Sequence, residues 1–250
     1  FTVLPAHVTS TCSAFGIDVL EDIAIVIWTT TPWTIPSNVA VCLNQEFDYV
    51  LVETSQGHLI LAEDLAEDCS NRWGLEMKIL GSTSGKNLAN IVLQHPLYER
   101  ESKVLLGDHV TTENGTGCVH TAPAHGLDDY FICIKSGLES IKALDNRGLF
   151  KQDYGPLAGL STAKGDPIVI ELLQESNSLI ANKEYEHSYP HCWRHKSPLI
   201  FMSTPQWFIS MDKSGLIDGA INAVSQVKWE PEWGEQRILS MLEDRPDWCI

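Results

Sequence analysis

Three consecutive threonines, Thr29 to Thr31, end an apolar stretch and lead into a turn marked by Pro32 and Pro36. Hydroxyl and methyl groups at a strand end can offer donors, acceptors and apolar surface to one pocket. The two prolines restrict the backbone dihedrals, which would hold such a pocket wall rigid. The same residues also suit an ordinary threonine-rich strand and turn, and propensity alone favours that simpler interpretation.

A second segment, residues 115–130, combines glycines, two histidines and two aspartates. Gly115 and Gly117 allow close backbone approach before a short strand that ends at His120. A helix is expected to begin near Leu127. His120 and His125 are candidates for a site, and for His125 the alternative of a satisfied structural group stays open.

The expected helix places Asp128 and Asp129 in its first turn. The positive end of the helix dipole would keep either carboxylate ionised at neutral pH, so that it could bind an ammonium group at a pocket rim. The alternative is that both are helix caps, and for Asp128 we favour the cap.

Neither segment contains the parts of a covalent hydrolase. There is no Gly-x-Ser-x-Gly elbow, and the spacing singles out no cysteine beside a histidine. Direct attack by water is therefore the simplest hydrolytic mechanism.

Composition restricts the class of protein. The net charge of −16 argues against strong, sequence-independent binding of nucleic acid through a basic surface. Seven scattered cysteines are typical of reduced, packed thiols in the cytoplasm, not of a disulfide framework. Neither a membrane span nor a secretory signal is visible, and the chain reads as part of a longer protein.

The elements that must position these residues follow from residue type and periodicity. Runs rich in β-branched and aromatic residues predict strands at 23–29, 39–43, 49–53 and 58–61. Helical spacing appears at 62–73, 128–136, 166–175, 217–227 and 236–244, with Asp166-Pro167 as the cap and first turn of the third helix. We therefore expect an α+β fold, with a strand-rich, barrel-like or strongly curved mixed sheet and peripheral helices.

Residues 28–38 resemble the threonine-rich motif of isoleucyl-tRNA synthetase editing (CP1) domains, and residues 115–130 resemble the second motif of that family. Segments 189–196, 204–208 and 245–250 are also similar to it, so the resemblance covers nearly the whole chain. Valyl and leucyl relatives continue the threonine motif with Arg-Pro, where Thr31 is followed here by Pro32-Trp33. The valyl motif also usually lacks the His120-Thr121 pair.

The resemblance implies a hydrolase that removes valine from mischarged Val-tRNA(Ile) by direct water attack. These synthetases are known to use a double sieve, in which a second site admits valine and excludes isoleucine. The resemblance implies that this chain carries the second site. By resemblance, Asp129 binds the α-ammonium group of the substrate, while Thr31 and His120 shape the side-chain pocket. These three are the expected catalytic residues.

Further substrate-binding residues are implied around them. Thr29, Thr30 and Asn38 would orient the ester or the terminal adenosine, and Asp128 lies beside the catalytic aspartate. Trp33 is included as well, although a packing role is favoured over base stacking.

The implied division is an editing core at 1–182 and a segment at 183–250 that returns to the catalytic domain of the parent synthetase. The signatures His-x-Gly-His and Lys-Met-Ser-Lys-Ser are absent, so ATP- and Mg-dependent charging of tRNA is expected elsewhere in the parent. Editing is expected to need no cofactor and no metal. A structural zinc at Cys192 and His195 is left open but not favoured, because no second ligand pair is evident.

Three alternatives remain: an RNA-end binding module without catalysis, a structural spacer with an inactive site, and the editing domain of a valyl or leucyl relative. The expected partners are the valine-carrying acceptor end of tRNA(Ile) and the parent's catalytic domain, without a membrane.

Overall fold

The structure is a computed structural model that describes residues 1–243, 245 and 247–250. The described chain forms two compact units, Phe1–Ser203 and Thr204–Ile250. Residues 183–203 are therefore part of the first unit in structural terms. The functional boundary at residue 182 stays a prediction.

A mixed sheet dominates the first unit. Among the described residues it has nine strands in the order β6-β4-β5-β2-β1-β7-β8-β3-β9. The strands are β1 (Thr2–Val3), β2 (Ile23–Ile25), β3 (Ala40–Leu43), β4 (Asp48–Thr54), β5 (Gly57–Ala62), β6 (Lys78–Ser84), β7 (Val92–Gln94), β8 (Glu101–Leu106) and β9 (Val119–Thr121). Only the pairs β2–β5 and β3–β8 are parallel within this described sheet. The strands predicted at 39–43, 49–53 and 58–61 are β3, β4 and β5, and the run at 23–29 forms the shorter β2.

The sheet curves so that its β9 end returns to the half that contains β2 and β5. Trp28 forms a parallel bridge with Val119, and the Ala62 N–H donates to the Thr116 carbonyl at 2.8 Å. The approach depends on Gly117, which has φ +70° and whose Cβ, if present, would lie 2.3 Å from the Ala62 Cβ. The expected strand-rich, curved α+β fold is confirmed.

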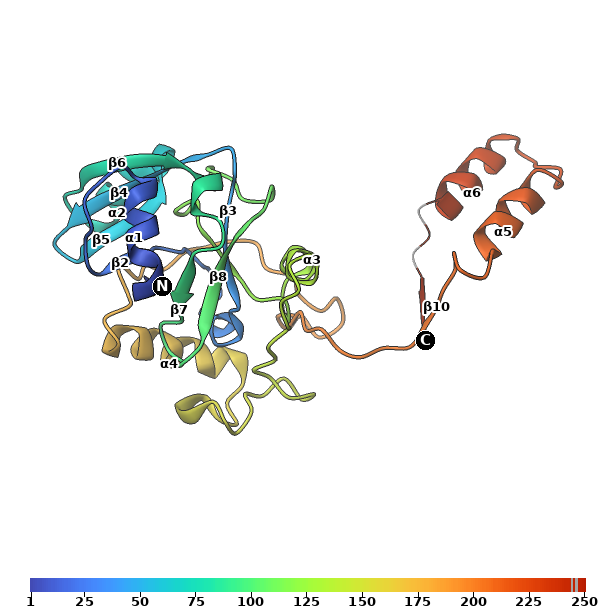
Figure 1. Cartoon of the computed structure of the whole chain (residues 1–250). Helices are drawn as coiled ribbons and strands as arrows, with labels where there is room; N and C mark the ends of the chain where they lie inside the picture. The colour runs from blue at the N-terminus through green and yellow to red at the C-terminus, as the bar shows by residue number, and fades with distance from the viewer. Residues whose placement is uncertain (244, 246) are drawn as a thin grey trace. The chain divides into compact units, whose positions relative to one another are not determined.

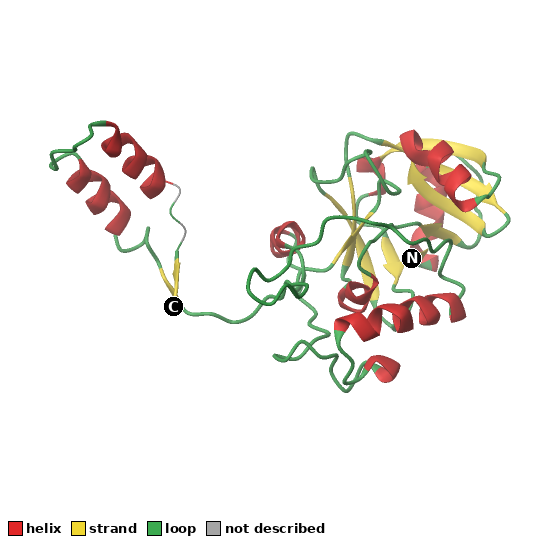
Figure 2. Ribbon diagram, turned by 180° about the vertical axis from the view of Figure 1, so that it is seen from behind, coloured by secondary structure: helices red, strands yellow, loops and turns green. Residues whose placement is uncertain are grey.

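Helices lie at the periphery of the strands (Figures 1 and 2). They are α1 (Pro5–Ala14), α2 (Ala66–Trp73), α3 (Leu127–Lys135) and α4 (Thr162–Glu175), with short 3-10 helices η1 (Pro32–Ser37), η2 (Glu63–Leu65), η3 (Gly85–Leu88) and η4 (Gly155–Leu157). The helix predicted at 62–73 corresponds to η2 followed by α2. The helix predicted at 128–136 corresponds to α3.

The predicted start of the helix at 166–175 is wrong. Helix α4 begins at Thr162 with Ser161 as its N-cap residue, so Asp166-Pro167 lies inside the helix. The Asp166 carboxylate instead accepts a hydrogen bond from the Trp33 N–H at 2.8 Å. A tertiary contact therefore uses the side chain that the sequence pattern assigned to a cap.

Three buried clusters hold the first unit together. The largest cluster joins the strands to α1 and α2. The second lies between η1 and α4 around Trp33 and Phe150. The third contains Cys42 of β3 and Cys133 of α3. All seven cysteines lie at described positions and are free, and five of them are buried. This agrees with the expectation of reduced, packed thiols.

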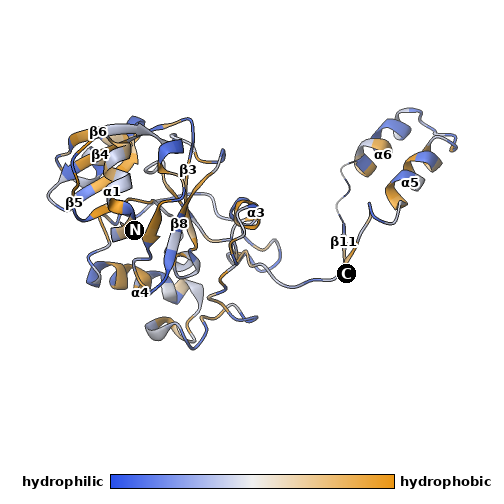
Figure 3. Cartoon of the chain, in the orientation of Figure 1, coloured by the Kyte–Doolittle hydropathy of each residue, from blue (hydrophilic) through white to orange (hydrophobic). Residues whose placement is uncertain are grey.

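The second unit pairs β10 (Phe208–Ile209) with β11 (Trp248–Cys249) and contains α5 (Leu216–Val224) and α6 (Trp233–Glu243). These helices match the predictions at 217–227 and 236–244, except that Asp244 lies outside the described residues, as does Pro246 of the 245–250 motif. Both helices carry hydrophobic residues (Figure 3), and Trp207 and Trp233 are exposed. No helix in the described part of the chain is long and apolar enough to span a membrane.

Candidate active site

The threonine-rich turn and the first turn of α3 meet at a cavity of about 220 Å³, hereafter the small cavity. Five of the eight predicted site residues line it. The lining consists of Thr29, Thr31, Trp33, Thr34, His120, Ala122, His125, Asp129, Tyr189 and Phe201. The two motifs, far apart in sequence, therefore form one site.

A second cavity of about 330 Å³, the large cavity, adjoins the first, because Thr29 and His120 line both. Thr30 and Trp28 contribute to the large cavity, together with the loop that leads from β8 to β9. The consecutive residues Thr30 and Thr31 therefore line adjacent cavities, Thr30 the large one and Thr31 the small one.

Hydrogen bonds within the threonine-rich turn fix its backbone. The Thr29 hydroxyl accepts from the Thr31 N–H at 3.0 Å, and the Thr31 carbonyl accepts from both the N–H and the hydroxyl of Thr34, at 3.1 and 2.8 Å. The expected rigidity of this wall thus comes from hydrogen bonding as well as from Pro32 and Pro36.

His120, on β9, is held by a buried network. Its Nε2 lies 2.9 Å from the Thr34 hydroxyl, and its Nδ1 lies 2.8 Å from the Asn38 Nδ2. The amide of Asn38 can only donate there, so Nδ1 accepts and the neutral ring carries its proton on Nε2. Burial lowers the pKa of His120 to about 3, which agrees with a neutral ring.

Asn38 is fully buried and lines neither cavity. Its amide nitrogen donates to His120 and to the Ala40 carbonyl, and its oxygen accepts from the Ser102 hydroxyl at 2.7 Å. This geometry does not support the predicted contact with the ester or the adenosine. Asn38 positions His120 instead.

Asp129 points from α3 into the small cavity. Its Oδ2 accepts from the Ala122 N–H at 2.8 Å, whereas in the described part of the chain Oδ1 has no protein partner and is not buried. Burial raises the pKa of the carboxyl group above its ordinary value, opposed by the Ala122 N–H and by His109. One oxygen is therefore fixed and the other is available to a ligand.

Asp128 is exposed and lines neither cavity, so the predicted substrate contact is not supported. The N-cap residue of α3 is Gly126, which means that neither aspartate is the N-cap. The favoured cap interpretation of Asp128 is therefore wrong as well, and its remaining contribution is a charge in the first helical turn.

His125 and Trp33 form part of the small-cavity wall and pack edge to face, with ring centroids 4.7 Å apart. His125 Nδ1 lies 2.9 Å from the Phe201 carbonyl, and Nε2 lies 3.0 Å from the Ser37 hydroxyl. Both ring nitrogens are thus engaged by the protein, which favours the structural interpretation of His125. Trp33 is buried, in agreement with the favoured packing role.

Cys192 and His195 supply half of a possible metal site. Cys192 Sγ lies 3.6 Å from His195 Nδ1 and 3.5 Å from the His195 backbone nitrogen. No third histidine, cysteine or acidic residue joins them among the described residues. Structural zinc is usually held by four ligands, so this pair alone does not fit the metal.

Comparison with known proteins places the chain in a family. The family profile of tRNA synthetases class I (I, L, M and V) matches residues 18–250. The chain belongs to the class I tRNA synthetases. It is 50% identical over 236 residues to the isoleucine–tRNA ligase of Idiomarina loihiensis, and 49% identical over 232 residues to that of Legionella pneumophila (strain Paris). Each match covers 92% of this chain and 25% of the relative, so the chain spans about a quarter of the length of these ligases.

This class I tRNA synthetase chain shares its fold with solved editing domains. It is similar to GlLeuRS-CP1, with a TM-score of 0.55 and 17% identity over 66% of this chain and 85% of that chain. It is also similar to the P. knowlesi cytosolic leucyl-tRNA synthetase editing domain, with a TM-score of 0.56 and 11% identity over 71% of this chain and 92% of that one. At these identities the likeness supports the fold alone.

Sequence reasoning did not assign several residues of the candidate site. Thr34 lies inside the threonine motif, where the pattern does not separate it from its neighbours. Tyr189 and Phe201 reach the small cavity from a segment that follows α4. Their aromatic character was visible in the sequence, but their position depends on tertiary contacts such as the hydrogen bond from the Ser203 N–H to the Ala124 carbonyl at 2.8 Å.

Proposed function

We propose that this chain is the proofreading part of an isoleucyl-tRNA synthetase, which hydrolyses the ester of valine wrongly attached to tRNA(Ile). The identity of about half of the residues to isoleucine–tRNA ligases supports the parent enzyme. The fold shared with leucyl-tRNA synthetase editing domains supports the proofreading role. The observation that carries the proposal is that Asp129 and the threonine-rich turn line the same small cavity.

In this proposal Asp129 binds the α-ammonium group of the aminoacyl ester. Its Oδ2 is already fixed by the Ala122 N–H, so Oδ1 can accept a hydrogen bond from the ligand without moving the carboxylate. A charge-assisted hydrogen bond of this kind is stronger than a neutral one and places the ester at a defined depth in the cavity.

Thr31 and His120 form the wall that separates valine from isoleucine. The two side chains differ by one methylene, worth about 1 kcal/mol of burial, so a rigid wall must act by steric exclusion. The bonds that fix the backbone of Thr31 and the ring of His120 supply that rigidity.

The reaction is direct hydrolysis. The oxygen of a water molecule bonds to the ester carbonyl carbon, and the bond between that carbon and the ribose oxygen breaks. The ribose oxygen takes a proton from the attacking water, which releases valine and free tRNA. No cysteine or serine lines the small cavity among the described residues, and the nitrogens of His120 and His125 are engaged by the protein. Positioning and electrostatics would supply most of the rate.

The large cavity would take the terminal adenosine. It adjoins the small cavity through Thr29 and His120 and carries the Thr30 hydroxyl. The wider partners in this proposal are the acceptor end of tRNA(Ile) and the catalytic domain of the parent, which would charge tRNA in the cytoplasm with ATP and Mg. Editing itself would use no cofactor.

Deacylation of charged tRNA tests the proposal. The chain is mixed with valyl-tRNA(Ile) or isoleucyl-tRNA(Ile), and release of the amino acid is compared with spontaneous hydrolysis. We expect faster release of valine and little change for isoleucine. If both esters decay at the spontaneous rate while the RNA is bound, the chain is a binding module and the hydrolytic function is wrong.

A further inference from the structure

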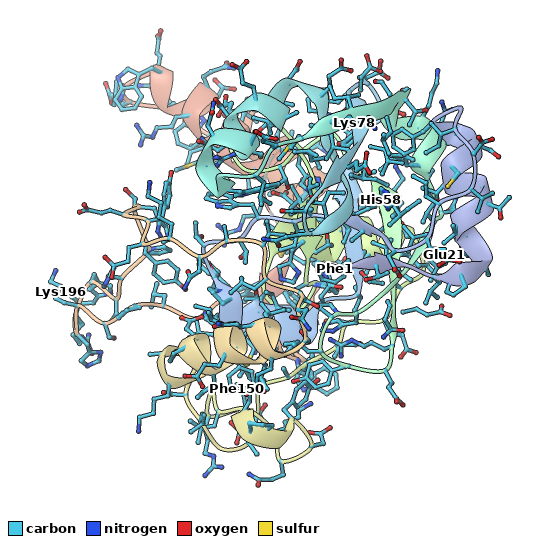
Figure 4. All side chains as sticks on the ribbon, turned by 90° about the vertical axis from the view of Figure 1, so that its left-hand side faces the viewer. Phe1, Glu21, His58, Lys78, Phe150 and Lys196 are labelled. Carbon is cyan, nitrogen blue, oxygen red and sulfur yellow. The ribbon has the colours of Figure 1, made fainter. Side chains whose placement is uncertain are left out.

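The 3-10 helix η1 forms part of the small-cavity wall, and its start is held by α4. The Trp33 N–H donates to the Asp166 carboxylate at 2.8 Å. Helices η1 and α4 also share the second buried cluster, which contains Phe150, labelled beside α4 in Figure 4. A hydrogen bond and apolar packing therefore fix the start of η1 together.

The end of η1 is held by His95, which lies in the turn between β7 and β8. Its Nδ1 lies 3.0 Å from the Leu97 backbone nitrogen and 3.2 Å from that of Tyr98. Both nitrogens are donors, so Nδ1 accepts and the neutral ring carries its proton on Nε2. That Nε2–H donates to the Ile35 carbonyl at 2.9 Å. His95 is fully buried, and burial lowers its pKa to about 3, which agrees with a neutral ring.

Arg100 ends the same turn and holds the next carbonyl of η1. One guanidinium nitrogen donates to the Pro36 carbonyl. The guanidinium also lies over the Tyr98 ring, 5.2 Å from its centroid. In the described part of the chain no carboxylate forms an ion pair with Arg100. The charge of this half-buried side chain is therefore directed at the backbone of η1, and a charge-assisted hydrogen bond is stronger than a neutral one.

The turn that carries both donors is itself fixed. The His95 N–H donates to the Arg100 carbonyl at 3.0 Å, and the Gln94 side chain donates to the Tyr98 carbonyl at 2.8 Å. Neither His95 nor Arg100 lines the small or the large cavity. Any effect of the two side chains on the site must therefore pass through η1.

Helix η1 is bonded to both residues that face the substrate side chain in the proposed function. Thr31 is its N-cap residue. The Thr34 hydroxyl donates to the Thr31 carbonyl at 2.8 Å and lies 2.9 Å from the His120 Nε2. A displacement of η1 would therefore move Thr31 and His120 as well.

We propose that Arg100, supported by His95, is a positioning residue that keeps the small-cavity wall in the place where it excludes isoleucine. The inference rests on the proposed function, in which this wall discriminates by overpacking. Overpacking is costly only where the surroundings cannot move, because a shift of the wall relieves the clash. Isoleucine exceeds valine by one methylene, so a small displacement of η1 is enough to admit it.

Release of isoleucine and valine from charged tRNA(Ile) by Arg100→Met tests the proposal. Methionine is a long, flexible side chain that cannot donate to the Pro36 carbonyl. The measured quantity is the ratio of isoleucine release to valine release above spontaneous hydrolysis, which is independent of the folded fraction because both esters meet the same protein. We expect this ratio to rise at least about fivefold, the lower end of the discrimination that overpacking supplies. Arg147→Met, which removes an exposed arginine of the same unit, is the matched control and should leave the ratio unchanged.

Arg100→Lys is the conservative variant, because it keeps a cation that can donate to the same carbonyl with a different geometry. Its ratio should lie between those of the parent and Arg100→Met. It also replaces the methionine variant if that protein does not fold. A ratio equal to that of the parent in Arg100→Met, or in Arg100→Lys where only the lysine variant folds, would overturn the proposal.

Hydrogen exchange in η1 distinguishes the proposal from the proposed function, because it needs no ester. The Thr34 and Asn38 amides, both bonded to backbone carbonyls of the threonine-rich turn, should exchange faster in Arg100→Met than in the parent or in Arg147→Met. Unchanged exchange, or faster exchange with an unchanged ratio in an active chain, would overturn the positioning role. Faster exchange in a chain whose parent releases no valine would refute the hydrolase and leave the support of η1 by Arg100 intact.

Discussion

His120 and Thr34 are joined by a hydrogen bond of 2.9 Å that links strand β9 to the threonine-rich turn. The Nε2–H of the neutral ring donates to the Thr34 hydroxyl, which in turn donates to the Thr31 carbonyl at 2.8 Å. Asn38 holds the other ring nitrogen. The wall that faces the small cavity is thus fixed by polar groups behind it.

Replacing Thr34 by Val should destabilise the fold. The two side chains have similar shapes, but valine leaves the His120 N–H buried without an acceptor, which costs about 1–3 kcal/mol. Unfolding in urea measures the effect. Thr30→Val is the matched control, because Thr30 is only partly buried and its hydroxyl makes a single long contact of 3.4 Å with that of Thr31. An equal loss in both variants would contradict this account of the network.

Replacing Gly126 by Ala should impair activity without unfolding the protein. A Cβ at Gly126 would lie 2.8 Å from Oδ2 and Cγ of Asp129, so the carboxylate must move away from its bond with Ala122. We expect at least a tenfold slower release of valine, with the unfolding free energy changed by less than about 1 kcal/mol. Gly219→Ala, where the added methyl group meets open space, should keep full activity. Normal hydrolysis in Gly126→Ala would show that the position of this carboxylate does not matter.

Trimming the cavity wall should change selectivity. If Thr31 and His120 exclude isoleucine by overpacking, which costs roughly 1–3 kcal/mol, then Thr31→Ala should admit the larger side chain. Hydrolysis of isoleucyl-tRNA(Ile) would rise while that of valyl-tRNA(Ile) changes less. The measured quantity is the ratio of the two rates, for Thr31→Ala and His120→Ala against the parent. A constant ratio in both variants would place the sieve elsewhere.

The sequence predicted the parts of the site better than their contacts. The resemblance to the family's two motifs assigned Thr31, His120 and Asp129 to one site, and residue type and periodicity predicted some of the strands and helices around them, but not β1, β6, β7, β8 or α1. The sequence did not predict the hydrogen bonds of Asn38 and Asp166. The buried Asn38 amide binds the His120 ring, and the Asp166 carboxylate accepts from the Trp33 N–H instead of capping a helix. Such pairings join residues far apart in the chain, and local propensity contains no information about them.

The stability of the fold should fall as the pH is lowered from about 6.5. Burial lowers the pKa values of His95 and His120 from 6.5 to about 3 in the folded protein. Between these values the unfolded chain binds protons that the folded chain does not, so acidification favours unfolding. Each such histidine contributes a slope of about 1.4 kcal/mol per pH unit.

The contribution of His120 to this pH dependence can be measured with His120→Gln, because glutamine does not titrate. Its unfolding free energy should depend less steeply on pH than that of the parent between pH 6 and 4. The raised pKa values of Asp129 and Asp166 act in the opposite direction in both proteins and cancel in the comparison. Identical slopes would mean that His120 is not held neutral.

Valine release by Asp129→Ala and Asp128→Ala tests whether the Asp129 carboxylate binds the substrate. Asp129 reaches the small cavity, whereas its neighbour in the same helical turn is exposed and reaches neither cavity. We expect Asp129→Ala to abolish hydrolysis of valyl-tRNA(Ile) while the fold is retained. Asp128→Ala should lose only about 0.3–1 kcal/mol of helix stabilisation and stay active. Retained hydrolysis in Asp129→Ala, or an equal loss in both variants, would show that the Asp129 carboxylate does not bind the substrate.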